Sequence, residues 1–273
     1  MVYYISNIIK EVVMAEKFAV FIDIDGTLTS KKGHIPEKNL EALTRAQKQG
    51  HKIFINTGRS RGNISDGLFD ELSFADGMVC GNGCHIILDG RDVFKRFIPV
   101  KVLTKLIDYI IERPDIWCVF EGEKELFYLE DFKKTRKDNS GKIPLVSAAE
   151  FEKNYSHCAI EVVAAGPKLP PDFEKTFENE LNVFRLDTYA DCVAHGCCKA
   201  DGMQKVLDIF GIDRAHTIAI GDSENDRNML EFAGTAVVMG NAPAAIKETA
   251  DFVTLSNDEA GVAFAVEKLI FGV

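Results

Sequence analysis

Two aspartates interrupt an apolar run near the start of the chain. The segment "AVFIDIDGTLTS" spans residues 19–30, and in it Asp23 and Asp25 are separated by Ile24 and followed by Gly26. Residues two apart in a strand point to the same side, so both carboxylates are expected to face the crevice beyond the carboxyl end of the strand. Like charges at this spacing raise each other's pKa, and a bound divalent cation relieves that cost. The pair indicates a cation site, and a turn that caps a helix is the alternative for this segment alone.

A second acidic cluster follows another apolar strand, closer to the C-terminus. The segment "AIGDSENDRNM" (residues 219–229) places Asp222, Glu224 and Asp226 after the strand, with Asn225 among them. Hard cations such as Mg²⁺ prefer oxygen ligands, usually one or two carboxylates together with water and a substrate phosphate. One such loop alone is typical of a solvated helix cap. Two such loops at the ends of neighbouring strands predict a shared Mg²⁺ site.

A phosphate site also needs positive charge and backbone amides. The segment "NTGRS" (residues 56–60) follows an apolar run and supplies the hydroxyl of Thr57, the backbone of Gly58 and the charge of Arg59. A helix is expected to begin there, which would add its N-terminal amides. Lys199 precedes another helical segment, but its position alone does not distinguish it from a surface lysine. These residues are the candidates for anion binding in a chain whose net charge is −10.

The candidate residues lie at the ends of strands in an alternating pattern of strands and helices. In the N-terminal part the pattern predicts a strand, a helix and two further strands, at 17–24, 35–50, 51–59 and 77–83. In the C-terminal part it predicts a helix and then three strand–helix units, at 199–211, 216–234, 235–250 and 251–271. Strand–helix–strand units of these lengths imply parallel strands with right-handed crossovers. The expected core is therefore a Rossmann-like, doubly wound parallel sheet of the α/β class.

Residues from about 84 to 188 follow a different pattern. They combine a hairpin-like alternation, helices and further strands, at 84–98, 100–112, 117–122, 125–130, 158–165 and 170–181. This mixture predicts an α/β domain inserted into the parallel one. The expected organisation is a core of residues 1–83 and 189–273 with an inserted domain of residues 84–188. Four aromatic residues of the inserted domain are expected to be core or sheet residues rather than to line a substrate pocket: Trp117, Phe120, Phe127 and Tyr128.

Together the polar segments resemble four motifs of the haloacid dehalogenase superfamily of phosphohydrolases. The matching segments are "DIDGTLTS", "NTGR", Lys199 in "CCKADG", and "GDSENDRNM", and the resemblance covers the chain from about residue 17 onward. The insertion between the second and third motifs looks like the C2B-type α/β cap of the Cof-type or IIB branch, which is sugar-phosphatase-like. The resemblance implies a Mg²⁺-dependent phosphomonoester hydrolase that acts on small organic phosphates, most often sugar phosphates.

The resemblance also implies a role for each candidate residue. Asp23 would be the nucleophile that forms an aspartyl-phosphate, and Asp25 would protonate the leaving alcohol and then activate water. The phosphoryl group would be bound by Thr57, Gly58, Lys199 and Asn225. Mg²⁺ would be bound by Asp23, the backbone carbonyl of Asp25, and Asp222. The surroundings of the site would be completed by Arg59 and Asp226.

Two other functions would use the same acids. A phosphomutase would form the same aspartyl-phosphate on Asp23 but return the phosphoryl group to a sugar. A signalling receiver would keep a phosphoaspartate as a switch, but in such modules the acid pair precedes the phosphorylated residue and no large insertion is present. The chain also departs from the family's usual pattern at Asn56 and Ala200, and neither residue is a reacting group.

The composition of the chain indicates which kinds of partner and which cellular compartment to expect. With 46% hydrophobic and 27% charged residues the chain is expected to fold, and its net charge disfavours nucleic acid as a partner. Seven cysteines without framework spacing predict the reducing cytoplasm. The first 17 residues lack a signal-peptide cleavage site and carry Lys10 and Glu11, so neither a signal peptide nor a membrane span is expected, and they form a short helix or precede a start at Met14. The expected partner is a small phosphorylated metabolite, and the oligomeric state is not indicated.

Overall fold

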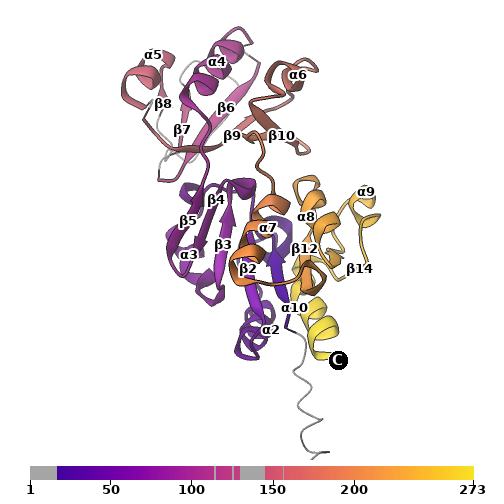
Figure 1. Cartoon of the computed structure of the whole chain (residues 1–273). Coiled ribbons are helices and arrows are strands. Elements are labelled where there is room, and N and C mark those ends of the chain that lie inside the picture. The colour runs from indigo at the N-terminus through magenta and orange to yellow at the C-terminus, as the bar shows by residue number, and fades with distance from the viewer. Residues whose placement is uncertain (1–16, 114, 125, 130–144, 156) are drawn as a thin grey trace, which may run out of the picture.

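The chain folds into two α/β bodies, each built on its own sheet, as the computed structural model in Figure 1 shows. The structure describes residues 17–113, 115–124, 126–129, 145–155 and 157–273. The predictions made for the first 16 residues lie outside the described residues. Within the described ranges, no helix has the length and apolar character needed to cross a membrane.

The larger sheet has eight strands in the order β14–β13–β12–β1–β2–β3–β4–β5. Its strands are β1 (Ala19–Ile22), β2 (Lys52–Asn56), β3 (Gly77–Cys80), β4 (His85–Leu88), β5 (Arg91–Lys95), β12 (Thr217–Gly221), β13 (Thr235–Val238) and β14 (Phe252–Val253). The six strands from β14 to β3 are parallel, and β4 and β5 run antiparallel to their neighbours. Because β1 lies between β12 and β2, the first, second and fourth motifs follow three adjacent strands at one edge of the sheet.

Helices cover both faces of the larger sheet. They are α2 (Glu37–Lys48), α3 (Asp66–Glu71) and α10 (Gly261–Val266) on one face, and α7 (Lys199–Phe210), α8 (Arg227–Phe232) and α9 (Ala244–Lys247) on the other. Successive residues of β1 pack on opposite sides, Val20 in the cluster of Leu43 and Phe21 in the cluster of Met203. Burial on both faces explains the continuous apolar run of this strand. The predicted doubly wound α/β core is confirmed.

The smaller sheet has six strands in the order β10–β11–β9–β6–β7–β8. Its strands are β6 (Trp117–Gly122), β7 (Leu126–Leu129), β8 (Leu145–Val146), β9 (Ile160–Gly166), β10 (Leu181–Arg185) and β11 (Ala190–Ala194). One face carries the helices α4 (Val100–Ile111), α5 (Ala148–Glu150) and α6 (Phe173–Phe177). The other face is turned toward the larger body (Figure 1).

Short helical turns complete the chain between these elements. They lie at Ile24–Leu28, Arg61–Asn63, Leu72–Phe74, Gly81–Gly83, Phe151–Tyr155, Arg214–His216, Glu224–Asp226, Asn257–Glu259 and Glu267–Phe271. Several of them directly follow strands of the larger sheet, where the predicted motifs lie. We call the body built on the eight-stranded sheet the core and the body built on the six-stranded sheet the cap.

The boundaries between core and cap lie at other residues than the sequence predicts. β4 and β5 fall inside the predicted insertion of residues 84–188, yet β4 pairs with β3 and extends the core sheet. β11 falls inside the predicted core segment of residues 189–273, yet it pairs with β9 and β10 in the cap. Alternation of apolar residues indicates a strand but not the strand with which it pairs. A strand close to a domain boundary is therefore easily assigned to the wrong sheet. The division into a catalytic core and a specificity cap is kept as a proposal.

Candidate active site

Asp23 and Asp25 lie in different surroundings, although a single residue separates them. β1 ends at Ile22, Asp23 continues the extended backbone, and the chain then turns through Ile24–Leu28. Asp23 is 4% exposed, whereas the side chain of Asp25 is 59% exposed. Both carboxylates line the cavity described below, but the strand ends before Asp25, so they do not share the side of one strand as expected. Gly26, at φ 79°, allows this turn, and a Cβ there would clash with the carboxylate of Asp222.

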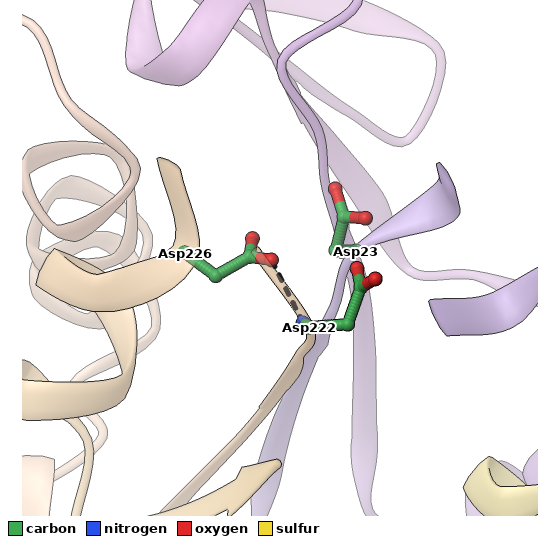
Figure 2. Close-up of side chains that lie close together, drawn as sticks. All are labelled: Asp23, Asp222 and Asp226. Carbon is green, nitrogen blue, oxygen red and sulfur yellow. Dashed lines mark hydrogen bonds between the residues drawn. The ribbon is translucent and has the colours of Figure 1, made fainter. Parts of the chain in front are cut away.

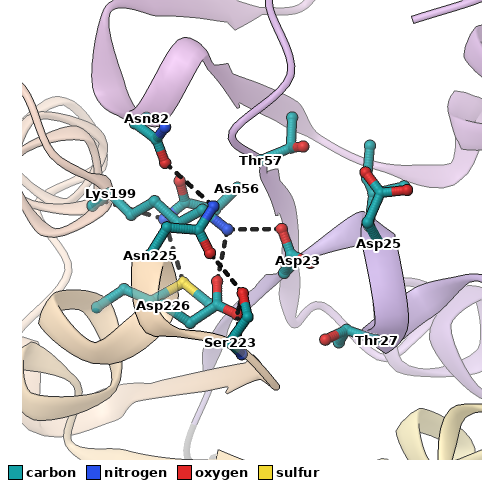
Figure 3. A network of polar contacts seen from close by, with 12 residues as sticks. Asp23, Asp25, Thr27, Asn56, Thr57, Asn82, Lys199, Ser223, Asn225 and Asp226 are labelled. Atoms are coloured by element: carbon teal, nitrogen blue, oxygen red, sulfur yellow. Dashed lines mark hydrogen bonds and ion pairs between the residues drawn. The ribbon is translucent and has the colours of Figure 1, made fainter. Parts of the chain in front are cut away.

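A buried lysine connects the first and fourth motifs. Lys199 is the first residue of α7 and its side chain is fully buried. Its Nζ donates to Oδ1 of Asp23 at 2.5 Å and to Oδ1 of Asp226 at 2.5 Å (Figure 3). Burial opposes the charged ammonium group, but the two carboxylates outweigh it and hold the pKa of Lys199 above its usual value. From its position alone, Lys199 could not be distinguished from a surface lysine. The structure places it in contact with Asp23, the predicted nucleophile.

Three carboxylates converge where β1 and β12 end. Asp23, Asp222 and Asp226 each offer one oxygen, and these oxygens lie within 4.8 Å of one another (Figure 2). Burial raises the pKa of Asp23 and raises that of Asp222 to about 7. Such acids are hard oxygen ligands that one positive side chain does not fully compensate. The cluster therefore fits the predicted Mg²⁺ by the chemistry of its donors.

The hydrogen bonds of the cluster separate candidate ligands from a supporting residue. Both oxygens of Asp226 are engaged, Oδ1 with Lys199 and Oδ2 with the backbone N–H groups of Asp222 and Ser223 at 2.9 Å each. Oδ2 of Asp23 accepts no hydrogen bond from any described residue. Asp222 accepts only longer hydrogen bonds from neutral side chains, from Thr27 at 3.1 Å and from Asn241 at 3.2 Å. We therefore expect Asp23 and Asp222 to hold a cation, while Asp226 organises the loop around them. The ligand role of the Asp25 carbonyl stays a prediction.

The second motif lies against the fourth. The hydroxyl oxygen of Thr57 accepts the N–H of Arg59 at 3.1 Å, and the carbonyl of Thr57 accepts the N–H of Asn82 at 3.0 Å. A Cβ on Gly58 would lie 2.9 Å from Nδ2 of Asn225, so a larger residue there would displace this side chain. The predicted phosphate-binding residues Thr57, Lys199 and Asn225 lie around Asp23 (Figure 3), and Gly58, which follows Thr57, lies beside Asn225.

Arg59 binds a side chain rather than pointing freely into the site. Its Nε donates to Oδ2 of Asp25 at 2.7 Å, and its second terminal nitrogen donates to Oδ1 at 2.6 Å. Such a two-point contact fixes the plane of the carboxylate as well as its position. The predicted supporting role of Arg59 therefore takes the form of a clamp on Asp25.

Two asparagines that the sequence does not single out as site residues support the cluster. Nδ2 of Asn56 donates to the carbonyl of Lys199 at 3.1 Å, which fixes the start of α7. Nδ2 of Asn241 donates to Oδ2 of Asp222 at 3.2 Å and to the carbonyl of Gly26 at 2.9 Å. Asn56 differs from the family's usual pattern, and this contact gives the difference a structural reason. Asn241 follows β13, and a polar residue just after another parallel strand of the core sheet is the signal that could have found it.

The cap contributes two further acids. A cavity of about 1100 Å³ lies between core and cap, with Asp23 and Gly58 in its core wall and Glu121 and Asp191 in its cap wall. Both cap acids lie within strands, Glu121 in "WCVFEG" and Asp191 in "ADCVA". A carboxylate inside an otherwise apolar strand is the signal that could have identified them.

Comparison with known proteins agrees with this geometry. The chain matches the family of haloacid dehalogenase-like hydrolases over residues 20–266. YkrA of Bacillus subtilis (strain 168) is 30% identical over 258 residues, which are 92% of this chain and 96% of YkrA. YwtE of the same organism, a 5-amino-6-(5-phospho-D-ribitylamino)uracil phosphatase, is 28% identical, with 93% of this chain and 98% of YwtE covered.

A solved structure extends the similarity to the complete fold. BT4131, a sugar phosphatase of subclass IIB of the superfamily, has a TM-score of 0.80 and 28% identity to this chain. The match covers 94% of this chain and 99% of BT4131, so it includes both core and cap. Family match, relatives and fold lead to one identification: this chain belongs to the haloacid dehalogenase-like hydrolases and is a phosphatase of their Cof-type branch.

Proposed function

We propose that this phosphatase hydrolyses phosphomonoesters of small organic alcohols, sugar phosphates above all, with Mg²⁺ and through an aspartyl-phosphate on Asp23. The observation that carries the proposal is the buried contact between Asp23 and Lys199, at the end of the strand where the carboxylates converge. A carboxylate can approach a phosphate dianion only where positive charge offsets both groups. The similarity to a sugar phosphatase over both bodies supports the substrate class.

The first half of the reaction would transfer the phosphoryl group to the enzyme. A carboxylate oxygen of Asp23 attacks phosphorus, and the bond between phosphorus and the leaving-group oxygen breaks. The ammonium group of Lys199 offsets charge on the phosphoryl oxygens, while the amide of Gly58 and the side chains of Thr57 and Asn225 orient them. When bound by Asp23 and Asp222, Mg²⁺ supplies further charge neutralisation between nucleophile and phosphate.

Asp25 would move the protons in both halves of the reaction. In the first half its carboxyl group donates a proton to the leaving alkoxide, and in the second half its carboxylate accepts one from the attacking water. The two-point contact with Arg59 orients the carboxylate for this task. Hydrolysis of the acyl phosphate on Asp23 then returns the enzyme to its starting state and releases inorganic phosphate.

Phosphate release from a broad panel of phosphomonoesters, with Mg²⁺ and with EDTA, tests the proposal. We expect Mg²⁺-dependent release from at least one sugar phosphate and no release by Asp23→Asn. Product analysis with a hexose phosphate separates hydrolysis from the phosphomutase alternative, because a mutase yields an isomeric sugar phosphate in place of free phosphate. Activity that survives both EDTA and Asp23→Asn would overturn the mechanism.

We also propose that the enzyme works in the cytoplasm on a small metabolite. All seven cysteines are free thiols, and five of them are buried. Free thiols persist in reducing compartments, whereas disulfides form in oxidising ones. Fractionation of cells with an antibody against the chain would check the compartment, and recovery in a secreted fraction would contradict it.

A further inference from the structure

We propose that Asp191 of the cap contacts the leaving group of the substrate and, together with Glu121, selects leaving groups that carry hydroxyls over those that carry a second anion. The inference rests on the proposed phosphomonoesterase function and adds the residues that choose the substrate. It starts from the arrangement of side chains on the cap face that closes the cavity.

Alternation along the cap strands decides which residues reach the cavity. In β6, Trp117 and Glu121 line the cavity, whereas Phe120 stacks on Phe127 in the cap interior with ring centroids 5.4 Å apart. Tyr128 of β7 also lines the cavity. All four aromatic residues are strand residues of the cap sheet, as predicted; the two phenylalanines pack in the cap interior, whereas Trp117 and Tyr128 also line the cavity.

Asp191 belongs to the same cavity-facing set. It lies opposite Ala164 of β9, which in turn lies opposite Val119 of β6, and Val119 lies opposite Tyr128 of β7. These four residues form one row across the sheet, and all of them line the cavity. The row is apolar or aromatic except for Asp191. One acid in an otherwise apolar row is the arrangement of a binding pocket that fixes one polar group of its ligand.

The carboxyl group of Asp191 reaches across to the core. It is 7% exposed, and its Oδ2 would lie 3.2 Å from a Cβ placed on Gly58. Gly58 belongs to the loop proposed to hold the phosphoryl group, and the same Cβ would lie 2.9 Å from Nδ2 of Asn225. The first atoms of the leaving group must pass this point as they leave the phosphate. Asp191 is therefore placed to contact the part of the substrate next to the ester oxygen.

The charge around Asp191 favours a neutral partner. Burial, and next the charge of Glu121, raise the pKa of Asp191 to about 8, while Asn82 lowers it. Burial also raises the pKa of Glu121, although Asn63 donates to both of its oxygens at 3.0 Å. Neither acid forms an ion pair with any basic side chain in the described part of the chain.

These surroundings distinguish two kinds of leaving group. A hydroxyl can donate to a carboxylate and can also exchange hydrogen bonds with a protonated carboxyl group, so it suits Asp191 in either state. A phosphate or carboxylate would meet two acids that form no ion pair, because the two arginines that line the cavity, Arg59 and Arg185, are paired with Asp25 and Glu174. Wherever Asp191 or Glu121 is ionised, it would have to bind a proton before the anion could enter. The aromatic side chains of Trp117 and Tyr128 add apolar surface for the carbon atoms of a polyol.

A matched pair of substrates tests the inference. The probes are a hexose 6-phosphate, which has a neutral leaving group, and the hexose 1,6-bisphosphate, which has a second anion. For the parent enzyme we expect kcat/KM to be at least ~10-fold higher for the monophosphate. In assays above the pKa of Asp191 of about 8, where this acid is ionised, Asp191→Asn removes the charge but keeps hydrogen bonding, so it should shrink that ratio several-fold. Asp191→Ala should lower kcat/KM for the monophosphate by ~10-fold or more, mainly through KM.

The matched control is Asp108→Asn, which makes the same change of charge on α4, on the far face of the cap sheet. It should leave the ratio as in the parent, and circular dichroism should show that all variants are folded. If Asp191→Asn and Asp108→Asn keep the same ratio as an active parent, the selection by Asp191 is refuted while the phosphatase proposal stands. If the parent releases phosphate from no phosphomonoester, including p-nitrophenyl phosphate, both proposals are overturned.

Discussion

At the scale of single residues, Asp23 and Asp25 are acids of the same type in different surroundings. Asp23 is buried against the ammonium group of Lys199, whereas Asp25 is more exposed and clamped by Arg59. A nucleophile gains from a fixed, desolvated position next to positive charge. A group that exchanges protons gains from access to the leaving group and to water. The unequal surroundings therefore support the unequal roles proposed for the pair.

At the same scale, the raised pKa of Asp191 predicts how the free energy of unfolding depends on pH. Its pKa in the folded state is about 8, against an ordinary value of 3.8, and the charges facing it include Glu121, Lys199 and Asp25. The folded state therefore holds a proton that the unfolded state releases, and stability falls as pH rises between these two values. Asp191→Asn removes this loss. We expect the free energy of unfolding of Asp191→Asn to exceed that of the parent by ~1 kcal/mol or more at about pH 8, and less at about pH 5.

Urea unfolding in EDTA at both pH values measures this effect. EDTA keeps divalent cations from changing the charge of the site. Asp108→Asn serves again as the control, because Asp108 is exposed on α4. Equal pH dependence in the parent and in Asp191→Asn would show that the acid is ordinarily ionised in the folded state.

At the scale of an element, the turn of residues 60–63 joins the phosphate loop to the cap. Nδ2 of Asn63 donates to the carboxylate of Glu121, and the N–H of Arg61 donates to Oε2 of Glu161 at 3.0 Å. Both acceptors belong to the cap, in β6 and β9. The turn directly follows Arg59, so the position of the cap and that of the phosphate loop are mechanically linked.

Gly62 lies where this turn meets the cap backbone. A Cβ there would lie 2.5 Å from the carbonyl oxygen of Gly122, a backbone atom that cannot move away alone. Gly62→Ala should therefore displace the cap from the turn and lower the free energy of unfolding by ~1–3 kcal/mol. Gly67→Ala in α3 is the control, because nothing lies within 4 Å of a Cβ there. Thermal unfolding of both variants measures the difference, and equal melting temperatures would contradict the close contact.

The sequence predicts most of the core and the centre of the site. Acids that directly follow apolar strands, as Asp23 and Asp222 do, must meet if the strands are parallel neighbours, and β1 and β12 are. The sequence does not predict contacts that join distant elements without a local pattern. Asp191 reaches Gly58 only because cap and core face each other, and Asn241 reaches Asp222 from the loop after β13. The extension of the core sheet by β4 and β5 escaped prediction for the same reason.

At the scale of the whole molecule, the site lies in a cavity between two bodies of an acidic protein. The net charge is −10, and the cavity wall itself carries more acids than bases. A phosphate ester enters such a cavity only if local positive charge offsets the acids. Lys199 supplies part of this charge, and we propose that Mg²⁺ supplies the rest. The cation should therefore stabilise the folded chain as well as permit the reaction.

We expect bound Mg²⁺ to raise the melting temperature of the chain. A ligand at 100 times its dissociation constant stabilises a protein by about 2.7 kcal/mol, which corresponds to ~5 °C or more for a chain of this size. EDTA should reverse the shift, and Asp222→Asn should abolish most of it. Asp208→Asn on α7, where the side chain is exposed, should keep the full shift. Differential scanning calorimetry makes the comparison, and an equal shift in both variants would exclude Asp222 as a ligand.

Trapping the phosphorylated enzyme tests the central claim most directly. After rapid acid quench during turnover of a sugar phosphate, peptide mass spectrometry locates any added phosphoryl group. We expect one such group on Asp23, more of it in Asp25→Asn because hydrolysis of the intermediate lacks its base, and none in Asp23→Asn. A phosphoryl group on another residue, or steady phosphate release by Asp25→Asn without any trapped intermediate, would contradict the account.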